Sequence, residues 1–174
     1  MTRLISGVAG GRRLKVPRSG VRPTGDRARE ALFNSLGSLL ELRGATVLDL
    51  YAGSGALGLE AASRGAASVV LVESDRRAAA VAAANVRALG VGALARVRTG
   101  TVAAVLAPDP GPDDAAHLVL LDPPYDLAEG ALRVVLDRLA AGWRAPGGLL
   151  VLERSARSPE PAWPSALVGE GRPR

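Results

Sequence analysis

Residues 48–58, LDLYAGSGALG, form the first segment whose residue types and spacing are suited to chemistry. An apolar run is followed by glycines that allow a sharp turn, and a helix that begins there aims free N–H groups toward a ligand. Glu73 follows Gly53 by twenty residues, a spacing at which a carboxylate can accept hydrogen bonds from ribose hydroxyls. A strand-to-helix turn without a ligand is the simpler interpretation, but Glu73 favours a nucleotide-like ligand.

The glycine spacing alone is compatible with NAD and with S-adenosylmethionine. Asp49, four residues before Gly53, favours S-adenosylmethionine, because its carboxylate suits a methionyl ammonium and would repel a pyrophosphate. A dehydrogenase is the weakest alternative, since no group of residues in the sequence is suited to hydride transfer.

Residues 122–125, Asp-Pro-Pro-Tyr, form the second segment, at the carboxyl end of a predicted strand, where open α/β sheets place their chemistry. The prolines fix the backbone and leave carbonyls without a competing N–H, so a rigid carbonyl and the Asp122 carboxylate make two acceptors for one exocyclic amine. Tyr125 offers a ring on which the base carrying that amine can stack. The segment predicts catalysis by positioning, with the amine lone pair directed at an electrophilic methyl group. The alternative needs no ligand: the prolines end the strand, and the segment caps the helix that follows.

Residues 22–30, RPTGDRARE, form the third segment. A charged run of this kind is usually the solvated face of a capped amphipathic helix. The residues alone do not favour a functional role over this interpretation. Both interpretations stay open at this point.

The fold that must position these segments alternates strands and helices from Gly44 onward. Strands are predicted over 46–51, 68–73, 95–99, 118–122 and 149–153, and helices over 57–64, 76–89, 102–106 and 129–141. Strands that are apolar on both faces and are each followed by a helix are typical of α/β proteins, so we expect a doubly wound, mostly parallel sheet. The last twenty residues contain four prolines and predict no regular structure.

The N-terminal region follows a different pattern. Residues 4–6 and 14–16 flank Gly10-Gly11 and predict a short β-hairpin. A helix capped by Thr24 or Asp26 is expected next. That helix is predicted to run to Ser38, with one face formed by Ala28, Ala31, Leu32, Ser35 and Leu39.

The positive charge of the chain is concentrated in the same N-terminal region. The net charge is +5, but residues 1–29 hold eight basic residues and one acidic residue, whereas residues 30–174 hold 14 basic and 16 acidic residues. This distribution predicts a basic arm that contacts the phosphates of a polyanion. The candidate contacts are Arg3, Arg12, Arg13, Lys15, Arg18, Arg22 and Arg27. Aromatic residues make up only 3% of the chain, which disfavours a base-stacking platform.

Composition excludes several classes of protein. With 174 residues, the chain has the size of one globular domain. It has no cysteine and a single histidine, His117, so disulfides, thiol nucleophiles and zinc knuckles are excluded and no metal site is expected. No apolar stretch reaches the length of a transmembrane helix, and the N-terminus lacks the apolar core of a signal peptide. We therefore expect a cytoplasmic protein without membrane contact.

Five segments taken together resemble one known family. In order along the chain they are GRRLKV (11–16), RPTGDRAREALFN (22–34), LDLYAGSGALGLE (48–60), SRGA (63–66) and DPPY (122–125). This order is similar to that of the RsmD family of S-adenosylmethionine-dependent 16S rRNA guanine-N2 methyltransferases, over about residues 3 to 153. The glycine and DPPY motifs are shared by many amino-methyltransferases, whereas the RPT segment and the arm make the resemblance specific.

The resemblance implies a class I, Rossmann-like methyltransferase that binds S-adenosyl-L-methionine. Residues 1–43 would be a basic RNA-binding extension and residues 44–174 the catalytic domain. The cofactor-binding residues assigned on this basis are Thr24, Asp49, Tyr51, Gly53, Ser54, Gly55, Gly58, Glu73, Ser74, Asp75, Thr101 and Val102. The catalytic residues, which would bind the target amine, are Asp122, Pro123, Pro124 and Tyr125. The implied partner is 16S rRNA or the assembling small ribosomal subunit.

Two features depart from the family pattern. The family usually has Gly-Asp-Ala after its third strand, where the acid binds the adenine amino group, and this chain has Gly100-Thr101-Val102. We expect the Thr101 hydroxyl or the Val102 backbone to take part of that role. The family fold also ends in an antiparallel strand pair, and this chain stops at Arg174 before such a segment. A truncated terminus and an exposed sheet edge beside the fifth strand are the two alternatives.

Two other functions remain open from the sequence. One keeps the chemistry but changes the target amine to adenine N6 in DNA or RNA, because DPPY is common to those enzymes. The other is a non-catalytic ribosome-assembly factor, which the altered residues 100–102 and the missing strand pair make plausible. The sequence does not determine the oligomeric state, and a monomer is favoured.

Overall fold

A computed structural model describes residues 2–17, 25–155 and 157–167 of the chain. Three predicted ligand contacts, Arg18, Arg22 and Thr24, lie outside the described residues. Among the helices of the described residues, none combines the length and apolar character needed to cross a bilayer.

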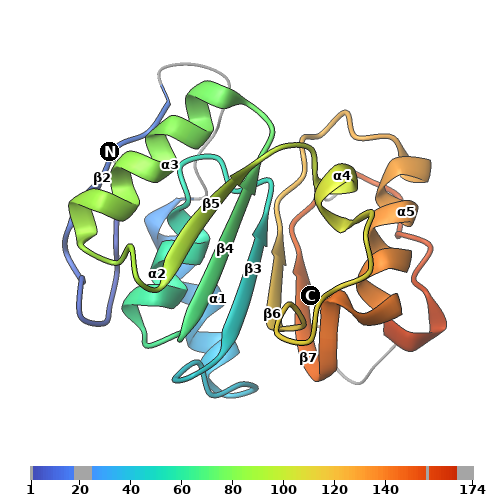
Figure 1. The fold of residues 1–174 in the computed structure, drawn as a ribbon, viewed down its shortest axis with the longest axis horizontal. Coiled ribbons are helices and arrows are strands. Elements are labelled where there is room, and N and C mark those ends of the chain that lie inside the picture. The colour runs from blue at the N-terminus through green and yellow to red at the C-terminus, as the bar shows by residue number, and fades with distance from the viewer. Residues whose placement is uncertain (1, 18–24, 156, 168–174) are drawn as a thin grey trace.

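Five parallel strands form the central sheet in the order β5-β4-β3-β6-β7. The strands are β3 (Thr46–Leu50), β4 (Ser68–Glu73), β5 (Ala95–Thr99), β6 (Ala116–Leu121) and β7 (Arg144–Leu152). The helices are α1 (Asp26–Gly37), α2 (Ala56–Ser63), α3 (Arg76–Leu89), α4 (Val102–Leu106) and α5 (Glu129–Arg138). In Figure 1, α1, α2 and α3 cover one side of the sheet and α4 and α5 the other, so the predicted doubly wound α/β architecture is confirmed.

The central strands are buried on both faces because alternate residues enter two separate cores. Val47 and Leu71 pack in the core on the α1–α3 side. Leu48 and Val70 pack in the core on the α4–α5 side. This double burial explains why these strands are continuous apolar runs, and it places their polar residues at the strand ends.

The N-terminal hairpin forms, but with shorter strands than predicted. Strand β1 (Thr2–Arg3) pairs antiparallel with β2 (Arg13–Leu14), and the two strands begin two residues and one residue earlier than expected. Leu4 and Leu14 are buried in the same core as the sheet residues on the α1–α3 side. The hairpin therefore shares a core with the sheet.

The predicted face of α1 is wrong except at Leu32, which packs against the core on the α1–α3 side. The residues that α1 buries are Arg29, Phe33 and Leu36, whereas Ala28 and Leu39 are exposed. The periodicity of apolar residues missed this face because it excluded an arginine, and Arg29 is buried beside acidic partners. Gly25 occupies the N-cap position without a side-chain cap. The carboxylate of Asp26 instead accepts a hydrogen bond from Arg29 at 2.9 Å.

The last helix and the last strand of the sheet differ from their predicted bounds. Helix α5 ends at Arg138 and continues as a π-helical turn, Leu139–Trp143, in which Gly142 has a φ of 143°. Strand β7 begins at Arg144, five residues before its predicted start, and forms an edge of the sheet in the described residues. Beyond it the only regular element among the described residues is a single 3-10 turn, Ser165–Leu167, with Trp163 and Leu167 packed against the core on the α4–α5 side.

Candidate active site

Three acidic residues gather at the carboxyl ends of three adjacent strands. Asp49 lies near the end of β3, Glu73 ends β4, and Asp122 follows β6. The parallel register pairs Leu50 with both Val72 and Leu121, which brings the three strand ends to one edge of the sheet. The site thus combines residues that are 24 and 49 positions apart in the chain.

The turn from β3 into α2 requires a strongly bent backbone. Tyr51, Gly53 and Gly55 have φ values of 63°, 55° and 80°, in the left-handed region that favours glycine. For Tyr51 this conformation is strained, as is common at ligand-binding sites. Gly58 is required for a different reason: a Cβ there would lie 2.4 Å from the Leu71 side chain and 3.0 Å from a carboxylate oxygen of Asp49. Helix α2 can therefore lie directly against the sheet and beside Asp49.

Asp49 is almost completely buried, with 1% of its surface exposed. Its Oδ2 accepts a hydrogen bond from the Gly58 N–H at 2.8 Å. Burial raises the pKa of Asp49 to about 7, and repulsion by Asp122 and Glu73 adds to this, while the Gly58 hydrogen bond opposes it. No basic side chain of the described residues forms an ion pair with Asp49. The buried carboxyl group is thus suited to a cationic ligand.

Glu73 organises the loop on the other side of the glycine turn. Its Oε2 accepts from the Gly53 N–H at 2.8 Å, and its Oε1 accepts from the Asp75 N–H at 2.8 Å. Each carboxylate oxygen retains a second lone pair, so both remain able to accept a ligand hydroxyl. Asp75 in turn caps α3 by accepting from the Ala78 N–H at 2.7 Å, and Ser74 between them is exposed.

Residues 100–102 follow β5 at the same edge of the sheet. The Gly100 N–H donates to the Glu73 carbonyl at 2.9 Å, which holds this loop beside Glu73. Thr101 caps α4 by accepting from the Ala104 N–H at 3.2 Å, and its hydroxyl proton is left to donate to another group. The side chain of Val102 is buried, so only its backbone can contact a ligand.

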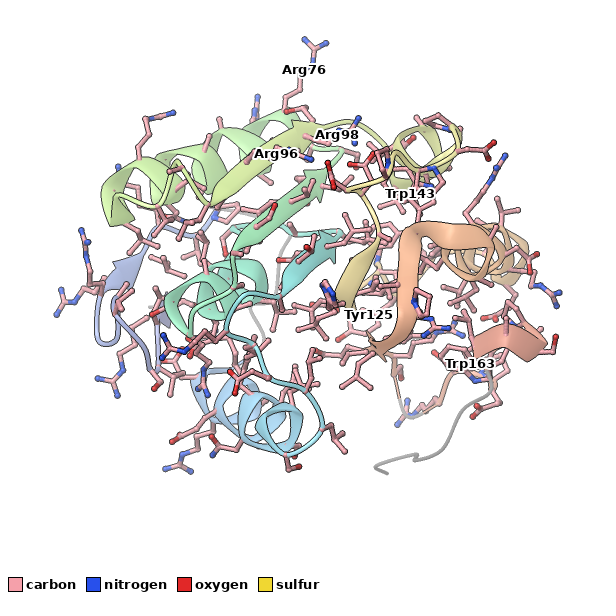
Figure 2. All side chains as sticks on the ribbon, turned by 60° about the horizontal axis from the view of Figure 1, so that its bottom comes forward. Arg76, Arg96, Arg98, Tyr125, Trp143 and Trp163 are labelled. Carbon is pink, nitrogen blue, oxygen red and sulfur yellow. The ribbon has the colours of Figure 1, made fainter. Side chains whose placement is uncertain are left out.

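The Asp122–Tyr125 loop lies at the end of β6, as predicted. The Asp122 N–H contacts the Leu50 carbonyl at 3.4 Å, which ties the loop to the end of β3. Pro123 is buried, whereas the Tyr125 side chain is 75% exposed and is labelled in Figure 2. The hollow beside this loop is lined by Pro123, Pro124, Tyr125, Leu127, Leu132, Arg154, Ser155 and Ser158. The loop thus presents a carboxylate and an accessible ring.

The basic arm is fastened to the glycine turn through Asn85, a residue that sequence reasoning missed. Asn85 Oδ1 accepts from the Lys15 N–H at 2.8 Å, and its Nδ2 donates to the carbonyls of Lys15 and Ser54, both at 2.9 Å. Arg12 donates to the Leu89 carbonyl at 3.2 Å and to the Ala88 carbonyl, so it caps the end of α3. An asparagine within an alanine-rich helix was the only sequence signal for this link.

The other candidate phosphate contacts of the arm differ in their surroundings. Arg3 lies 3.7 Å from Asp26 and is largely exposed. Arg13, Arg27 and the Lys15 side chain are exposed and form no ion pair within the described residues. These three side chains are thus the described arm cations that are most available to an external anion.

Glu60 is a second residue that sequence reasoning missed. It is fully buried on α2, where its carboxylate accepts from the Ile5 and Ser6 N–H groups at 2.7 and 3.1 Å. Arg64 donates to the same carboxylate at 2.8 Å, and Arg29 lies 3.9 Å from it. The signal in the sequence was a single acid among the apolar residues of α2. Glu60 joins the hairpin, α1 and α2 behind the glycine turn.

Comparison with known proteins agrees with this geometry. A family described as Conserved hypothetical protein 95 matches residues 2–169. The chain is 39% identical to ribosomal RNA small subunit methyltransferase D of Escherichia coli (strain K12), with 94% of this chain and 79% of that protein covered. It is 34% identical to the protein of the same name from Haemophilus influenzae, with 90% of this chain and 80% of that protein covered.

Solved structures show the same fold. A putative methyltransferase, yhhF, from Escherichia coli matches with a TM-score of 0.82 at 37% identity and covers 94% of this chain and 86% of its own. A hypothetical protein from Thermus thermophilus matches with a TM-score of 0.80 at 38% identity, covering 92% of this chain and 90% of its own. From these matches, the chain belongs to the RsmD family of methyltransferases, that of ribosomal RNA small subunit methyltransferase D.

Proposed function

We propose that this protein transfers a methyl group from S-adenosylmethionine to the exocyclic N2 of a guanine in 16S rRNA. The observation that carries the proposal is the meeting of the buried Asp49 with the Asp122–Tyr125 loop at adjacent strand ends. The names of the relatives support the ribosomal RNA substrate. One strand end would hold the methyl donor and the next would hold the accepting amine.

The residues around the glycine turn fit the proposed cofactor. S-adenosylmethionine supplies an electrophilic methyl group on a positively charged sulfonium. Asp49 would meet its methionyl ammonium, since a buried carboxyl group with a raised pKa gains most from a nearby cation. Glu73 would accept from the ribose hydroxyls. Thr101 and the Val102 backbone would contact the adenine in place of the acid that the family usually has there.

The Asp122–Tyr125 loop would hold the target base. The Asp122 carboxylate and the Pro123 carbonyl would each accept one N–H of the amine, which turns the nitrogen lone pair toward the methyl group. The exposed Tyr125 ring would stack against a guanine that has left its own stack, a step that costs on the order of a few kcal/mol. Catalysis would then rest on alignment of two bound groups.

The basic arm would bind the RNA backbone. We assign residues 1–43 to an RNA-binding extension and residues 44–174 to the catalytic domain, because the arm holds the surplus of positive charge. Lys15 is tied through Asn85 to the carbonyl of Ser54 in the glycine turn. Phosphates bound by the arm would therefore lie close to the cofactor site.

Methylation of rRNA from a strain that lacks the orthologous enzyme tests this proposal. The rRNA is supplied both naked and in assembled small subunits, with labelled S-adenosylmethionine, and the modified nucleosides are identified by mass spectrometry. We expect N2-methylguanosine at one position. N6-methyladenosine would show that the target amine is wrong, and binding of the cofactor without any transfer to either substrate would exclude the proposed activity.

The raised pKa of Asp49 predicts pH-dependent cofactor binding. Only the ionised carboxylate attracts the ammonium, so the affinity for S-adenosylmethionine should fall about tenfold as the pH decreases from 8 to 6, through the pKa of about 7. Calorimetry at several pH values measures this. Asp49→Asn should bind weakly at every pH and remove the dependence.

His117, the single histidine of the chain, provides the matched control for this experiment. Its Nδ1 accepts from the Thr46 N–H at 3.1 Å, at the opposite end of β3 from the site. His117→Asn keeps a hydrogen-bond acceptor and should leave the pH profile of cofactor binding unchanged. A pH dependence that is lost in His117→Asn and kept in Asp49→Asn would contradict the assignment.

A further inference from the structure

Strand β5 forms an edge of the sheet in the part of the chain that the structure describes, and it carries arginines on one face. Along β5, Ala95 and Val97 pack in the core on the α1–α3 side. Arg96 and Arg98 alternate with them and are exposed. The register pairs Arg96 with Val70 and Arg98 with Val72, two residues of the opposite core. Both arginines therefore lie on the face of the sheet opposite α1–α3.

A third arginine lies close to this edge. Arg76 is the first residue of α3 and follows Glu73 by three positions. The hydrogen bond from Gly100 to the Glu73 carbonyl holds the end of β5 beside the end of β4. Figure 2 shows Arg76, Arg96 and Arg98 on this side of the molecule, with Arg76 projecting outward. We call these three residues the arginine surface.

The arginines of this surface differ from those of α5 in their partners. On α5, Arg133 contacts Asp137 at 2.9 Å and Arg138 contacts Asp109 at 3.7 Å. In contrast, Arg76 and Arg98 form no ion pair with any residue that the structure describes. Arg96 makes one contact of 3.7 Å with Asp114 while its side chain stays 61% exposed.

The acidic groups nearby do not neutralise the surface. Asp113 and Asp114 line the same hollow as Arg96 and Arg98, and only Asp114 reaches an arginine. Asp75 precedes Arg76, but its Oδ1 accepts from the Ala78 N–H and it forms no ion pair with Arg76. The net charge of residues 30–174 is slightly negative, so their composition does not indicate a basic surface. The arginines come close to one another only in the folded chain.

We infer that the arginine surface binds the phosphodiester backbone of the RNA substrate, as a second contact beside the basic arm. The inference rests on the proposed function. Exposed guanidinium groups match phosphate oxygens in charge and hydrogen-bond geometry, and those of Arg76 and Arg98 form no ion pair among the described residues. The arm reaches the site through Asn85 on the α3 side, whereas Arg96 and Arg98 lie on the opposite face of the sheet. RNA is thereby held on two sides of the site.

Direct binding of a 16S rRNA transcript to the full chain tests this inference. Arg76→Gln/Arg98→Gln should weaken RNA binding roughly tenfold at moderate salt and reduce the slope of log affinity against log salt by about 1.4, since two phosphate contacts are lost. Arg133→Gln/Arg138→Gln removes the same charge from paired arginines on α5 and should leave both quantities close to wild type. Arg98→Lys should retain most of the affinity, because it keeps the charge.

Cofactor binding is measured in parallel because Arg76 and Arg98 lie near Glu73. The affinity for S-adenosylmethionine should be unchanged in all variants. If both double variants bind RNA alike, or if Arg76→Gln/Arg98→Gln loses only cofactor affinity, the inference is overturned. Failure of the wild-type protein to methylate rRNA would instead contradict the proposed function, and the binding comparison would still decide the role of the surface.

Discussion

Replacing Asp122 with alanine should reduce the rate of methyl transfer about a thousandfold, because alignment of a bound amine accounts for a contribution of that order. The site offers Asp122 and the Pro123 carbonyl as the two acceptors for that amine. With the carboxylate absent, the amine loses one of them and its lone pair is no longer directed at the methyl group. Single-turnover transfer to rRNA at saturating cofactor measures the effect.

Cofactor affinity should not fall with activity in the same variant. The charge of Asp122 contributes to the raised pKa of Asp49, so its removal lowers the pKa of Asp49. More of Asp49 is then ionised near neutral pH, and binding of S-adenosylmethionine should be equal to or tighter than in the wild type. Loss of both cofactor affinity and activity would point to collapse of the site.

Asp126 supplies the matched control for this experiment. It is an exposed carboxylate four residues after Asp122 in the same loop. Asp126→Ala should keep the transfer rate within about twofold, since surface substitutions have small effects. Asp122→Asn should lie between wild type and alanine, because its amide oxygen remains an acceptor. Full activity of Asp122→Ala would remove this loop from the proposed site.

Replacing Glu60 with alanine should destabilise the protein by about 3–5 kcal/mol, the cost of breaking a buried ion pair and leaving its partners unpaired. Glu60 is fully buried, and its carboxylate accepts hydrogen bonds from the Ile5 and Ser6 N–H groups and from Arg64. Its loss leaves two backbone donors and the Arg64 guanidinium without the carboxylate that accepts from them. The expected decrease in Tm is about 10 °C for a chain of this size.

The comparison variant for Glu60 is Asp137→Ala, which removes an acid from the half-exposed pair with Arg133 on α5. Exposed pairs contribute at most about 1 kcal/mol, so its Tm should stay close to wild type. Glu60→Gln keeps the size of the side chain and should be less harmful than alanine. Equal denaturant midpoints for Glu60→Ala and Asp137→Ala would show that the buried network does not hold the hairpin in place.

Much of the regular structure could be predicted because its signals are local. The predicted bounds 68–73, 76–89, 95–99 and 102–106 coincide with β4, α3, β5 and α4. In these segments the apolar pattern, the caps and the glycines all favour the same element. The face of α1 could not be found this way, because the burial of Arg29 depends on Asp26 and on the distant Glu60.

For the candidate site, the sequence by itself determined which residues carry chemical groups: a glycine turn with Asp49, an acid ending a strand at Glu73, and a rigid loop at Asp122–Tyr125. It also located the surplus of positive charge in the first 29 residues. These are properties of residue type and short spacing. They were sufficient to predict a doubly wound sheet and the edge at which the site would lie.

Only the tertiary structure decided how those groups influence one another. Parallel register brings Asp49, Glu73 and Asp122 together, and burial then raises the pKa of Asp49. Packing of the hairpin against α2 buries Glu60, whose carboxylate then accepts hydrogen bonds from the hairpin backbone. Burial, electrostatic repulsion and the arginine surface all depend on distances between residues far apart in the chain, which composition and spacing do not contain.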